Sequence, residues 1–278
     1  MDWRIRRVTV DGEHLRAAIR PGEGVPLVLC SELGANFELL APFVDALERS
    51  EIVLFDVPGV GGSGLRQPLR RMSGYADLTA GLLDALGYEG PVDMLGAAWG
   101  GFLAQAFAHR PPARLRRLVL AATSPGQVMF PGRLASLWRL ATPTRFRSAR
   151  RYAAVAESVY GGRAATEPAL IRDNAAAAKI PSHLGYASQL LSMVGFSSLP
   201  WLHRLYTPTL ILAGDDDPVI PLVNARLLNL LLPRSRLHVV RGAGHLLLVT
   251  RPAEVASVVA RFLAARDLRD ELPAKDIL

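Results

Sequence analysis

Short runs of apolar residues, separated by segments with helical periodicity, constrain the fold of this chain more than any other feature. Continuous apolar runs of this length are typical of strands that are buried on both faces of a parallel sheet. Their alternation with helices predicts an α/β fold, with a mostly parallel sheet and helices on both of its faces. The runs are Pro26–Cys30, Ile52–Phe55, Val92–Leu95, Leu118–Ala121, Leu210–Ala213 and Leu237–Val240.

The two ends of the chain complete this pattern. Trp3–Val10 and His14–Ile19 alternate apolar and polar residues on either side of the turn Asp11-Gly12, which predicts an N-terminal hairpin. Tyr75–Leu86 has the periodicity of an amphipathic helix, and Val255–Ala264 predicts a closing helix.

One long segment interrupts the alternation. Between Pro125 and Pro208 no clear strand occurs, only helical pieces such as Leu134–Leu140 and Arg150–Tyr160. A segment of this length is too long for a simple loop in a compact domain. We therefore expect a core formed by residues 1–125 and 208–278, with a helical cap at 126–207 inserted between two strands.

Composition excludes several classes of protein. Half of the 278 residues are apolar and the net charge is +7, which excludes a disordered chain. Cys30 is the only cysteine, so no disulfide framework and no cysteine-rich zinc site is expected. The charged N-terminus lacks a signal-peptide pattern and no apolar run is long enough to span a membrane, so we expect a cytoplasmic protein.

Arginine is concentrated in one part of the chain. No acidic residue occurs from Met94 to Ala156, whereas ten arginines do. The arginines in the expected cap could hold it against an anionic surface or a substrate that carries a carboxylate. A solvated charged face explains the same pattern, and no nucleic-acid partner is expected because no recognised binding module accompanies the charge. The cap arginines are Arg133, Arg139, Arg145, Arg147, Arg150 and Arg151.

The stretch around Ala98 has the pattern of a sharp turn between a strand and a helix. A predicted strand runs into Gly96-x-Ala98-x-Gly100, and a helix begins at Trp99. This is the context of the nucleophile elbow, G-x-S-x-G, in which the flanking glycines permit a turn that raises the central side chain above the sheet. Here the central residue is alanine, which has no nucleophilic atom. An ordinary strand-helix turn would give the same pattern.

Two later segments follow predicted strands and carry groups for acid–base chemistry. Leu210–Pro221 reads LILAGDDDPVIP and includes Asp217, and Gly242-x-Gly244-His245 follows the last strand. An aspartate run after a strand is often a helix cap, and a single histidine is often structural. The order elbow, acid, histidine is, however, that of an α/β-hydrolase triad.

In that arrangement two backbone N–H groups bind the oxyanion, one after the nucleophile and one after an earlier strand. They would belong to Trp99 and to Leu33, in the stretch Cys30-Ser-Glu-Leu-Gly-Ala-Asn36.

These residues together give the chain a family resemblance. It resembles the α/β-hydrolase superfamily, and within it the intracellular medium-chain-length polyhydroxyalkanoate depolymerases, over about Pro26 to Leu263. The resemblance implies that Asp217 is the triad acid and that His245 is the base, which would deprotonate a serine at position 98. The stretches that carry it are Gly34-Ala-Asn36, Phe55-Asp-Val-Pro-Gly-Val-Gly-Gly-Ser63, Trp99-Gly-Gly101, Val119-Leu-Ala-Ala-Thr123, Tyr160-Gly-Gly162, Leu212-Ala-Gly-Asp-Asp-Asp-Pro218 and Gly244-His-Leu246.

The sequence departs from this family at two places. Family members carry serine where Ala98 stands, and a pair of the Asn-Gly type near Ser31-Glu32. Glu32 would oppose a developing oxyanion unless it points away or is protonated. Ser31 could replace the lost nucleophile, although it lacks an elbow, and a polar residue at a strand end explains it equally.

Ala98 has two interpretations. It is either an engineered substitution in an otherwise complete site, or a natural residue in a site whose His245 and Asp217 act alone as an acid–base dyad. The first makes the chain an inactivated form of a hydrolase for carboxylic hydroxyacyl esters or polyester. The second makes it a lyase or cyclase, and a third possibility is a ligand-binding pseudoenzyme.

The expected cap is rich in large apolar residues that the sheet does not need. Some of them should line an acyl-binding channel above Ala98, and we single out Met129, Phe130 and Trp138 as substrate-binding residues. The remaining large apolar residues of the expected cap could line the channel too or could only pack the cap onto the core, and they are Leu134, Leu137, Leu140 and Phe146. No cofactor and no metal site is expected, and the sequence does not predict an oligomeric state.

Overall fold

A mixed sheet forms the centre of the protein. The computed structural model describes residues 3–110 and 114–265. Within them the sheet has eight strands in the order β1-β2-β4-β3-β5-β6-β7-β8. Pairs β1–β2 and β2–β4 are antiparallel and all other neighbours are parallel, which confirms the mostly parallel sheet. The strands are β1 (Arg4–Val10), β2 (Glu13–Arg20), β3 (Glu23–Cys30), β4 (Ser50–Phe55), β5 (Val92–Ala97), β6 (Leu115–Ala121), β7 (Thr209–Gly214) and β8 (Ser235–Val240).

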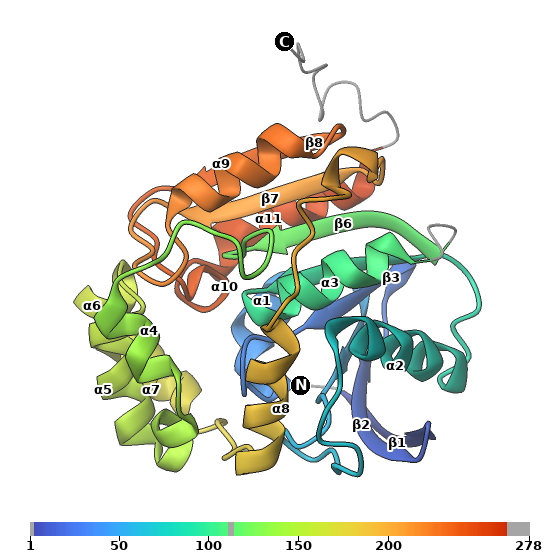
Figure 1. The fold of residues 1–278 in the computed structure, drawn as a ribbon, viewed down its shortest axis with the longest axis horizontal. Coiled ribbons are helices and arrows are strands. Elements are labelled where there is room, and N and C mark those ends of the chain that lie inside the picture. The colour runs from blue at the N-terminus through green and yellow to red at the C-terminus, as the bar shows by residue number, and fades with distance from the viewer. Residues whose placement is uncertain (1–2, 111–113, 266–278) are drawn as a thin grey trace.

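The central strands are buried because helices cover both faces of the sheet. Strands β5 and β7 are buried along their whole length, which is why their sequences are continuous apolar runs. The three helices on one face are α2 (Met72–Ala85), α3 (Trp99–His109) and α9 (Leu222–Leu231). The three on the other face are α1 (Ala41–Ala46), which follows the short helix η1 (Phe37–Leu40), α10 (Leu247–Thr250) and α11 (Pro252–Ala264). Figure 1 shows these two helical layers around the sheet.

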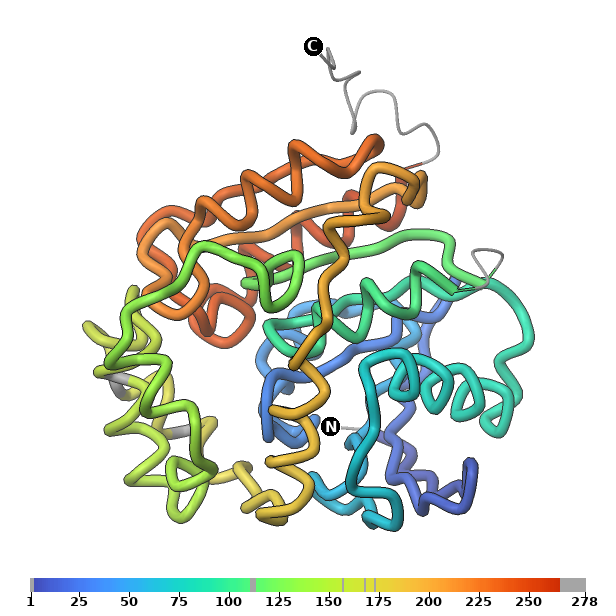
Figure 2. Tube along the Cα trace, in the orientation of Figure 1, coloured from blue at the N-terminus to red at the C-terminus, as the bar shows by residue number. Residues whose placement is uncertain are grey.

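The chain leaves the sheet after β6 and returns to it at β7 through residues 126–207, which we call the inserted segment. Figure 2 shows this excursion as the green and yellow part of the tube. A bridge between Gly126 and Ser197 joins the two ends of the excursion. Its helices are α4 (Leu134–Leu140), η3 (Pro143–Arg147), α5 (Ala149–Val159), α6 (Arg163–Thr166), α7 (Pro168–Ala175), α8 (His183–Met193) and η4 (Leu202–Arg204).

Two of these helices begin at serine residues that the sequence supplies as N-caps. The Ser148 hydroxyl accepts a hydrogen bond from the Arg151 backbone at 3.1 Å, and the Ser182 hydroxyl accepts one from Gly185 at 2.9 Å. The division of the chain into a core and a cap stays a prediction, and the end of its second core stretch, 266–278, lies outside the described residues.

The inserted segment has an apolar cluster of its own, which also contacts the core. Phe146, Tyr152 and Tyr160 are buried together with Leu39 and Ile220 of the core. Because this contact is apolar and buried, it holds the segment over the carboxyl ends of the parallel strands. No helix in the described part of the chain is both long and apolar enough to cross a bilayer.

Candidate active site

The turn between β5 and α3 places Ala98 in a strained conformation. Ala98 has φ 49° and ψ −111°, a region that residues other than glycine rarely adopt. The glycines on either side are required by space, because a Cβ on Gly96 would lie 2.2 Å from the Gly100 oxygen and a Cβ on Gly100 would lie 2.2 Å from the Cys30 oxygen. The turn therefore has the conformation of a nucleophile elbow with alanine at its tip.

Asp217 and His245 lie beside the elbow and contact each other. Asp217 follows β7, and its Oδ1 accepts hydrogen bonds from the backbone N–H groups of Val219 at 2.8 Å and Ile220 at 2.9 Å. Its Oδ2 lies 2.8 Å from Nδ1 of His245, and both side chains are almost completely buried. These bonds orient the carboxylate, so that the other ring nitrogen of His245, Nε2, is left for chemistry.

The environment of His245 shifts its basicity and fixes its ring. Burial lowers the pKa of His245, but the charge and hydrogen bond of Asp217, together with the charge of Glu32, outweigh burial, so the pKa lies above its ordinary value of 6.5. The ring stacks on Tyr160 with centroids 5.7 Å apart, and the His245 backbone N–H donates to the Tyr160 carbonyl at 2.8 Å. The inserted segment thus contributes to the position of the histidine.

Two cavities meet at Ala98, Glu32 and His245. The larger has a volume of about 220 Å³ and is lined mainly by apolar side chains, with Glu32, Arg145 and His245 as its charged or titratable residues. The smaller has a volume of about 30 Å³ and extends from Ala98 towards Ser31 and Tyr152. A mostly apolar cavity with a few polar groups at one end is the usual form of a small-molecule site.

Two side chains of the inserted segment hold the peptide group between Leu33 and Gly34. The guanidinium of Arg145 donates to the Leu33 carbonyl at 2.6 Å, and the Gly34 N–H donates to Oε1 of Gln189 at 2.9 Å. Both ends of this peptide group are therefore hydrogen-bonded to the segment. Gly34 has φ +72°, and a Cβ there would lie 2.6 Å from the Tyr186 ring, so only glycine fits.

The side chain of Trp99 is fixed in a similar way. Its indole N–H lies within hydrogen-bond distance of the Gln189 carbonyl, at 3.0 Å, and of the Ser192 hydroxyl, at 3.1 Å, both in α8. In the described residues, neither the Leu33 nor the Trp99 backbone N–H donates to another protein group. Both residues line the larger cavity, as an oxyanion-binding pair would.

Glu32 is a carboxyl group in the interior of the site. It borders both cavities and is half-buried, and the Tyr152 side chain lines the smaller cavity beside it. Burial raises the pKa of Glu32 above its ordinary value of 4.5, and the opposing effects of His245 and Arg145 compensate only in part.

Comparison with known proteins identifies the family. A family model described as the alpha/beta hydrolase fold matches residues 25–252. This chain belongs to the α/β hydrolase fold family. It is 44% identical, over 93% of its length and 92% of the relative's, to a poly(3-hydroxyalkanoate) depolymerase from Ectopseudomonas oleovorans. It is also 29% identical to a 2-hydroxy-6-oxo-2,4-heptadienoate hydrolase from Pseudomonas putida, over 88% of this chain and 91% of the relative.

Solved structures share the fold. An esterase from Thermogutta terrifontis superposes with a TM-score of 0.77 over 94% of this chain and 98% of that one, at 23% identity. A hydrolase from Pseudomonas aeruginosa superposes with a TM-score of 0.79, at 24% identity, over 94% of this chain and 98% of that chain. The resemblance to α/β hydrolases, and to polyhydroxyalkanoate depolymerases in particular, is thus confirmed.

The structure brings some of the expected substrate residues to the hydrolase site but not others. Met129 lines the larger cavity, together with Leu137 and Leu140. Phe130 and Trp138 do not line it, since they are 53% and 82% exposed, so their expected place in the channel needs correction. Trp138 faces solvent because consecutive residues of a helix point in different directions, and in α4 it is the preceding residue, Leu137, that faces the cavity.

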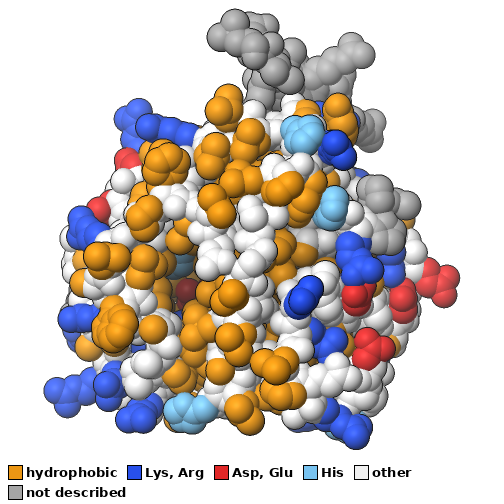
Figure 3. All heavy atoms as spheres, in the orientation of Figure 1, with side chains coloured by type: hydrophobic (Ala, Val, Ile, Leu, Met, Phe, Trp, Pro, Cys, Tyr) orange, Lys and Arg blue, Asp and Glu red, His pale blue; other side chains and the backbone are white. Residues whose placement is uncertain are grey.

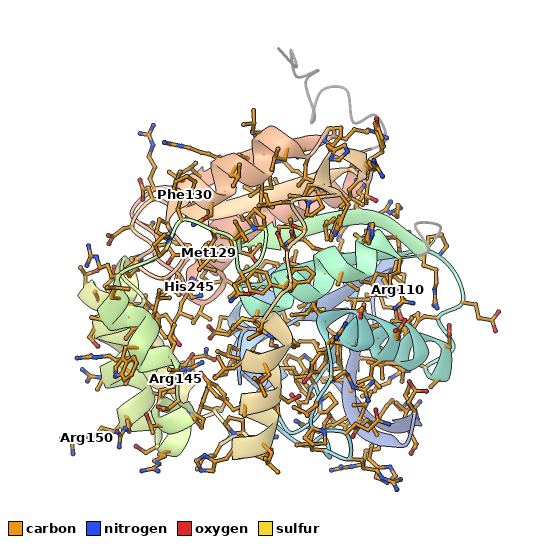
Figure 4. The ribbon with its side chains drawn as sticks, in the orientation of Figure 1. Arg110, Met129, Phe130, Arg145, Arg150 and His245 are labelled. Carbon is orange, nitrogen blue, oxygen red and sulfur yellow. The ribbon has the colours of Figure 1, made fainter. Side chains whose placement is uncertain are left out.

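Figure 4 shows Phe130, Met129 and His245 one below the other in the left half of the view, between α9 and the helices of the inserted segment. Figure 3 shows apolar side chains gathered on the face that α4 and α8 form.

Arg145 also differs from its expected role. Arg145 is only 1% exposed, and its guanidinium stacks over the Phe146 ring, 4.4 Å from the ring centroid. It is therefore not part of a charged outer surface, unlike Arg150, which Figure 4 places at the outer edge. The other arginines of the expected cap face solvent, and they are Arg133, Arg139, Arg147 and Arg151.

The sequence did not indicate three polar residues of the inserted segment that build this site. Tyr152, Tyr160 and Gln189 contact Glu32, His245 and the Leu33–Gly34 peptide group from helices remote in sequence. In the sequence, Tyr160 stands in the Tyr160-Gly-Gly162 stretch, which carried the family resemblance but no chemical role. Among the residues that the structure describes, no group of three or more His, Cys, Asp or Glu side chains could hold a metal ion.

Proposed function

We propose that this α/β hydrolase acts on carboxylic esters of hydroxyacyl chains, as small molecules or as a polyester. The observation that carries the proposal is the elbow conformation of Ala98 beside the hydrogen-bonded pair of Asp217 and His245. The mostly apolar cavity above it suits an acyl chain. The similarity to a poly(3-hydroxyalkanoate) depolymerase supports a hydroxyacyl ester as the substrate class.

In the serine form of this site the reaction would proceed through an acyl-enzyme. The hydroxyl of residue 98 would attack the ester carbonyl while Nε2 of His245 takes its proton. The backbone N–H groups of Leu33 and Trp99 would stabilise the oxyanion. His245 would return the proton to the leaving alcohol, and water would hydrolyse the acyl-enzyme by the same steps.

The chain with Ala98 cannot form this covalent intermediate, so we propose that it is an inactivated form of such an enzyme. Loss of the nucleophile in a triad enzyme lowers turnover by a factor on the order of 10⁴–10⁶. A cytoplasmic location is part of the same proposal.

The experiment compares the chain with its Ala98→Ser variant on esters of short and medium hydroxyacyl chains. The serine variant is expected to hydrolyse the esters and to be labelled covalently by an organophosphonate, whereas the chain with Ala98 is not labelled. Absence of both turnover and labelling in the serine variant would contradict the proposal.

A second candidate function is a non-hydrolytic conversion by a natural Ala98 enzyme, with His245 and Asp217 as an acid–base dyad. The half-buried Glu32 favours it, because this second carboxyl group borders the cavity where a negative charge would oppose an oxyanion. Loss of such a conversion in His245→Ala would support the dyad, whereas its survival without both His245 and Asp217 would rule the dyad out. A ligand-binding role would instead leave binding intact in both variants without any turnover.

A further inference from the structure

The smaller cavity beside Ala98 has room for water. Its volume of about 30 Å³ exceeds the roughly 10–15 Å³ that a cavity needs to hold a water molecule. Ser31, Glu32, Tyr152 and His245 provide the polar part of its wall. A buried water requires between two and four polar partners, and this wall supplies that number.

The polar groups on this wall have hydrogen-bonding capacity left. The Ser31 hydroxyl is buried, and within the described residues it has no hydrogen-bond partner. His245 uses Nδ1 for Asp217, which leaves Nε2. A water molecule in the cavity would have Nε2 of His245 and the Glu32 carboxyl group as hydrogen-bond partners.

We propose that this cavity binds a water molecule that attacks the ester carbonyl directly, so that the chain with Ala98, which is inactivated for the acyl-enzyme route, retains slow ester hydrolysis. In this mechanism His245 is the base, and Glu32 is a second catalytic residue whose carboxyl group would accept a hydrogen bond from the same water, since both residues line the cavity. The inference rests on the proposed ester substrate, and it adds a nucleophile and a residue that the serine mechanism does not use.

The step balances without a cofactor. The water oxygen forms a bond to the carbonyl carbon, and one water proton moves to Nε2 of His245. The tetrahedral intermediate collapses, the bond to the alcohol oxygen breaks, and His245 gives its proton to the departing alkoxide. The ester and one water become a carboxylic acid and an alcohol, with no change of oxidation state.

Glu32 suits this reaction better than it suits the serine mechanism. A carboxylate accepts the second hydrogen of the water, which orients the oxygen lone pair towards the substrate. In the serine form the negative charge opposes the oxyanion, and its favourable effect on protonated His245 is common to both mechanisms. The two forms should therefore respond in opposite directions when Glu32 loses its charge.

The test measures hydrolysis of a p-nitrophenyl hydroxyacyl ester by the chain with Ala98. The protein is first treated with an organophosphonate, which inactivates contaminating serine esterases. Hydrolysis above the buffer rate is expected, with a fall of about 10²-fold or more in His245→Ala. Glu32→Gln is expected to lower the rate at least about tenfold. Glu89→Gln, at an exposed site, is the matched control and should leave the rate unchanged.

A parallel set of the same variants is made in the Ala98→Ser protein. In that set Glu32→Gln is expected to keep or raise the rate of ester hydrolysis relative to Ala98→Ser alone. Circular dichroism spectra verify that each variant is folded. Binding and oxyanion stabilisation alone can give a residual rate of roughly 10³–10⁴ over water. If the rate of the Ala98 chain does not depend on His245 or on Glu32, that residual explains it and the water mechanism is wrong. If the Ala98→Ser protein and its variants have no esterase activity, it is the proposed function as an ester hydrolase that is wrong.

Discussion

The guanidinium of Arg145 donates a hydrogen bond to the backbone carbonyl of Leu33, so the inserted segment reaches the loop after β3 that borders Ala98. Gln189 accepts from the Gly34 N–H at the other end of the same peptide group. Since a peptide group is planar, these two bonds fix its orientation. The oxyanion-binding loop of the proposed mechanism is therefore positioned by two residues of the inserted segment.

Replacement of Arg145 by methionine should destabilise the protein by about 2–4 kcal/mol, because it leaves the Leu33 carbonyl and the Tyr186 hydroxyl without a charged donor in the interior. Urea unfolding measures this loss. Arg145→Lys keeps the charge but cannot bond both partners in the same geometry, so its stability should be intermediate. Exposed Arg150→Met is the control and should change stability by less than about 0.5 kcal/mol.

Arg145 should also affect turnover in the serine form as a positioning residue. If the hydrogen bond to the Leu33 carbonyl also holds the Leu33 N–H, in the preceding peptide group, in position for the oxyanion, Arg145→Lys should lower kcat more than it raises KM. Equal kcat values for Arg145→Lys and its parent would show that the hydrogen bond is structural only.

The elbow should not tolerate alanine at Gly100. The added Cβ would lie 2.2 Å from the Cys30 carbonyl oxygen, so β3 and α3 would have to move apart. We expect a loss of about 2 kcal/mol or more in the free energy of unfolding, measured in urea. Gly90→Ala, at a site with no atom within 4 Å of the new Cβ, is the control. Similar stability of both variants would contradict this account of the turn.

Glu32 should make the protein less stable as the pH rises. Its pKa is raised in the folded state because of burial, so above about pH 4.5 the folded protein binds more protons at this site than the unfolded chain does. The free energy of unfolding therefore decreases with rising pH. Glu32→Gln removes this contribution, and its stability relative to the parent should increase from pH 4.5 to pH 8.

Urea unfolding at several pH values tests this expectation. His245, whose pKa is also raised, contributes a loss of the same sign, and because the charge of Glu32 is one cause of that raised pKa, Glu32→Gln reduces this loss as well, so both effects act in the same direction in the comparison. A constant difference between Glu32→Gln and its parent across this range would show that Glu32 has the same pKa in both states.

The features that the sequence predicted correctly are those that local pattern determines. A strand buried on both faces must be apolar throughout, so β5 and β7 were visible as continuous runs. A sharp turn needs small residues at fixed positions, so Gly96 and Gly100 marked the elbow. The order of Asp217 and His245 along the chain then indicated a contact that the structure contains.

The features that it did not predict depend on contacts between distant segments. Nothing near Arg145 distinguishes it from the exposed Arg147, and only the packing of η3 against the loop after β3 buries one and not the other. The contact between Tyr152 and Glu32 likewise joins a helix of the inserted segment to the end of β3. Such pairs follow from tertiary packing, which a single sequence does not encode in any local pattern.

The cavity wall should decide the acyl chain length in the serine form. Leu137 lines the cavity and its neighbour Trp138 points into solvent from the same helix, so the pair offers a matched comparison. Leu137→Ala enlarges the cavity, and the ratio of kcat/KM for long over short acyl esters should rise by about tenfold, since one methylene in a pocket contributes roughly 1–3 kcal/mol. Trp138→Ala should leave this ratio unchanged. A change of the ratio in Trp138→Ala, with none in Leu137→Ala, would mean that the acyl chain lies across the outer face of α4 and not in the cavity above Ala98.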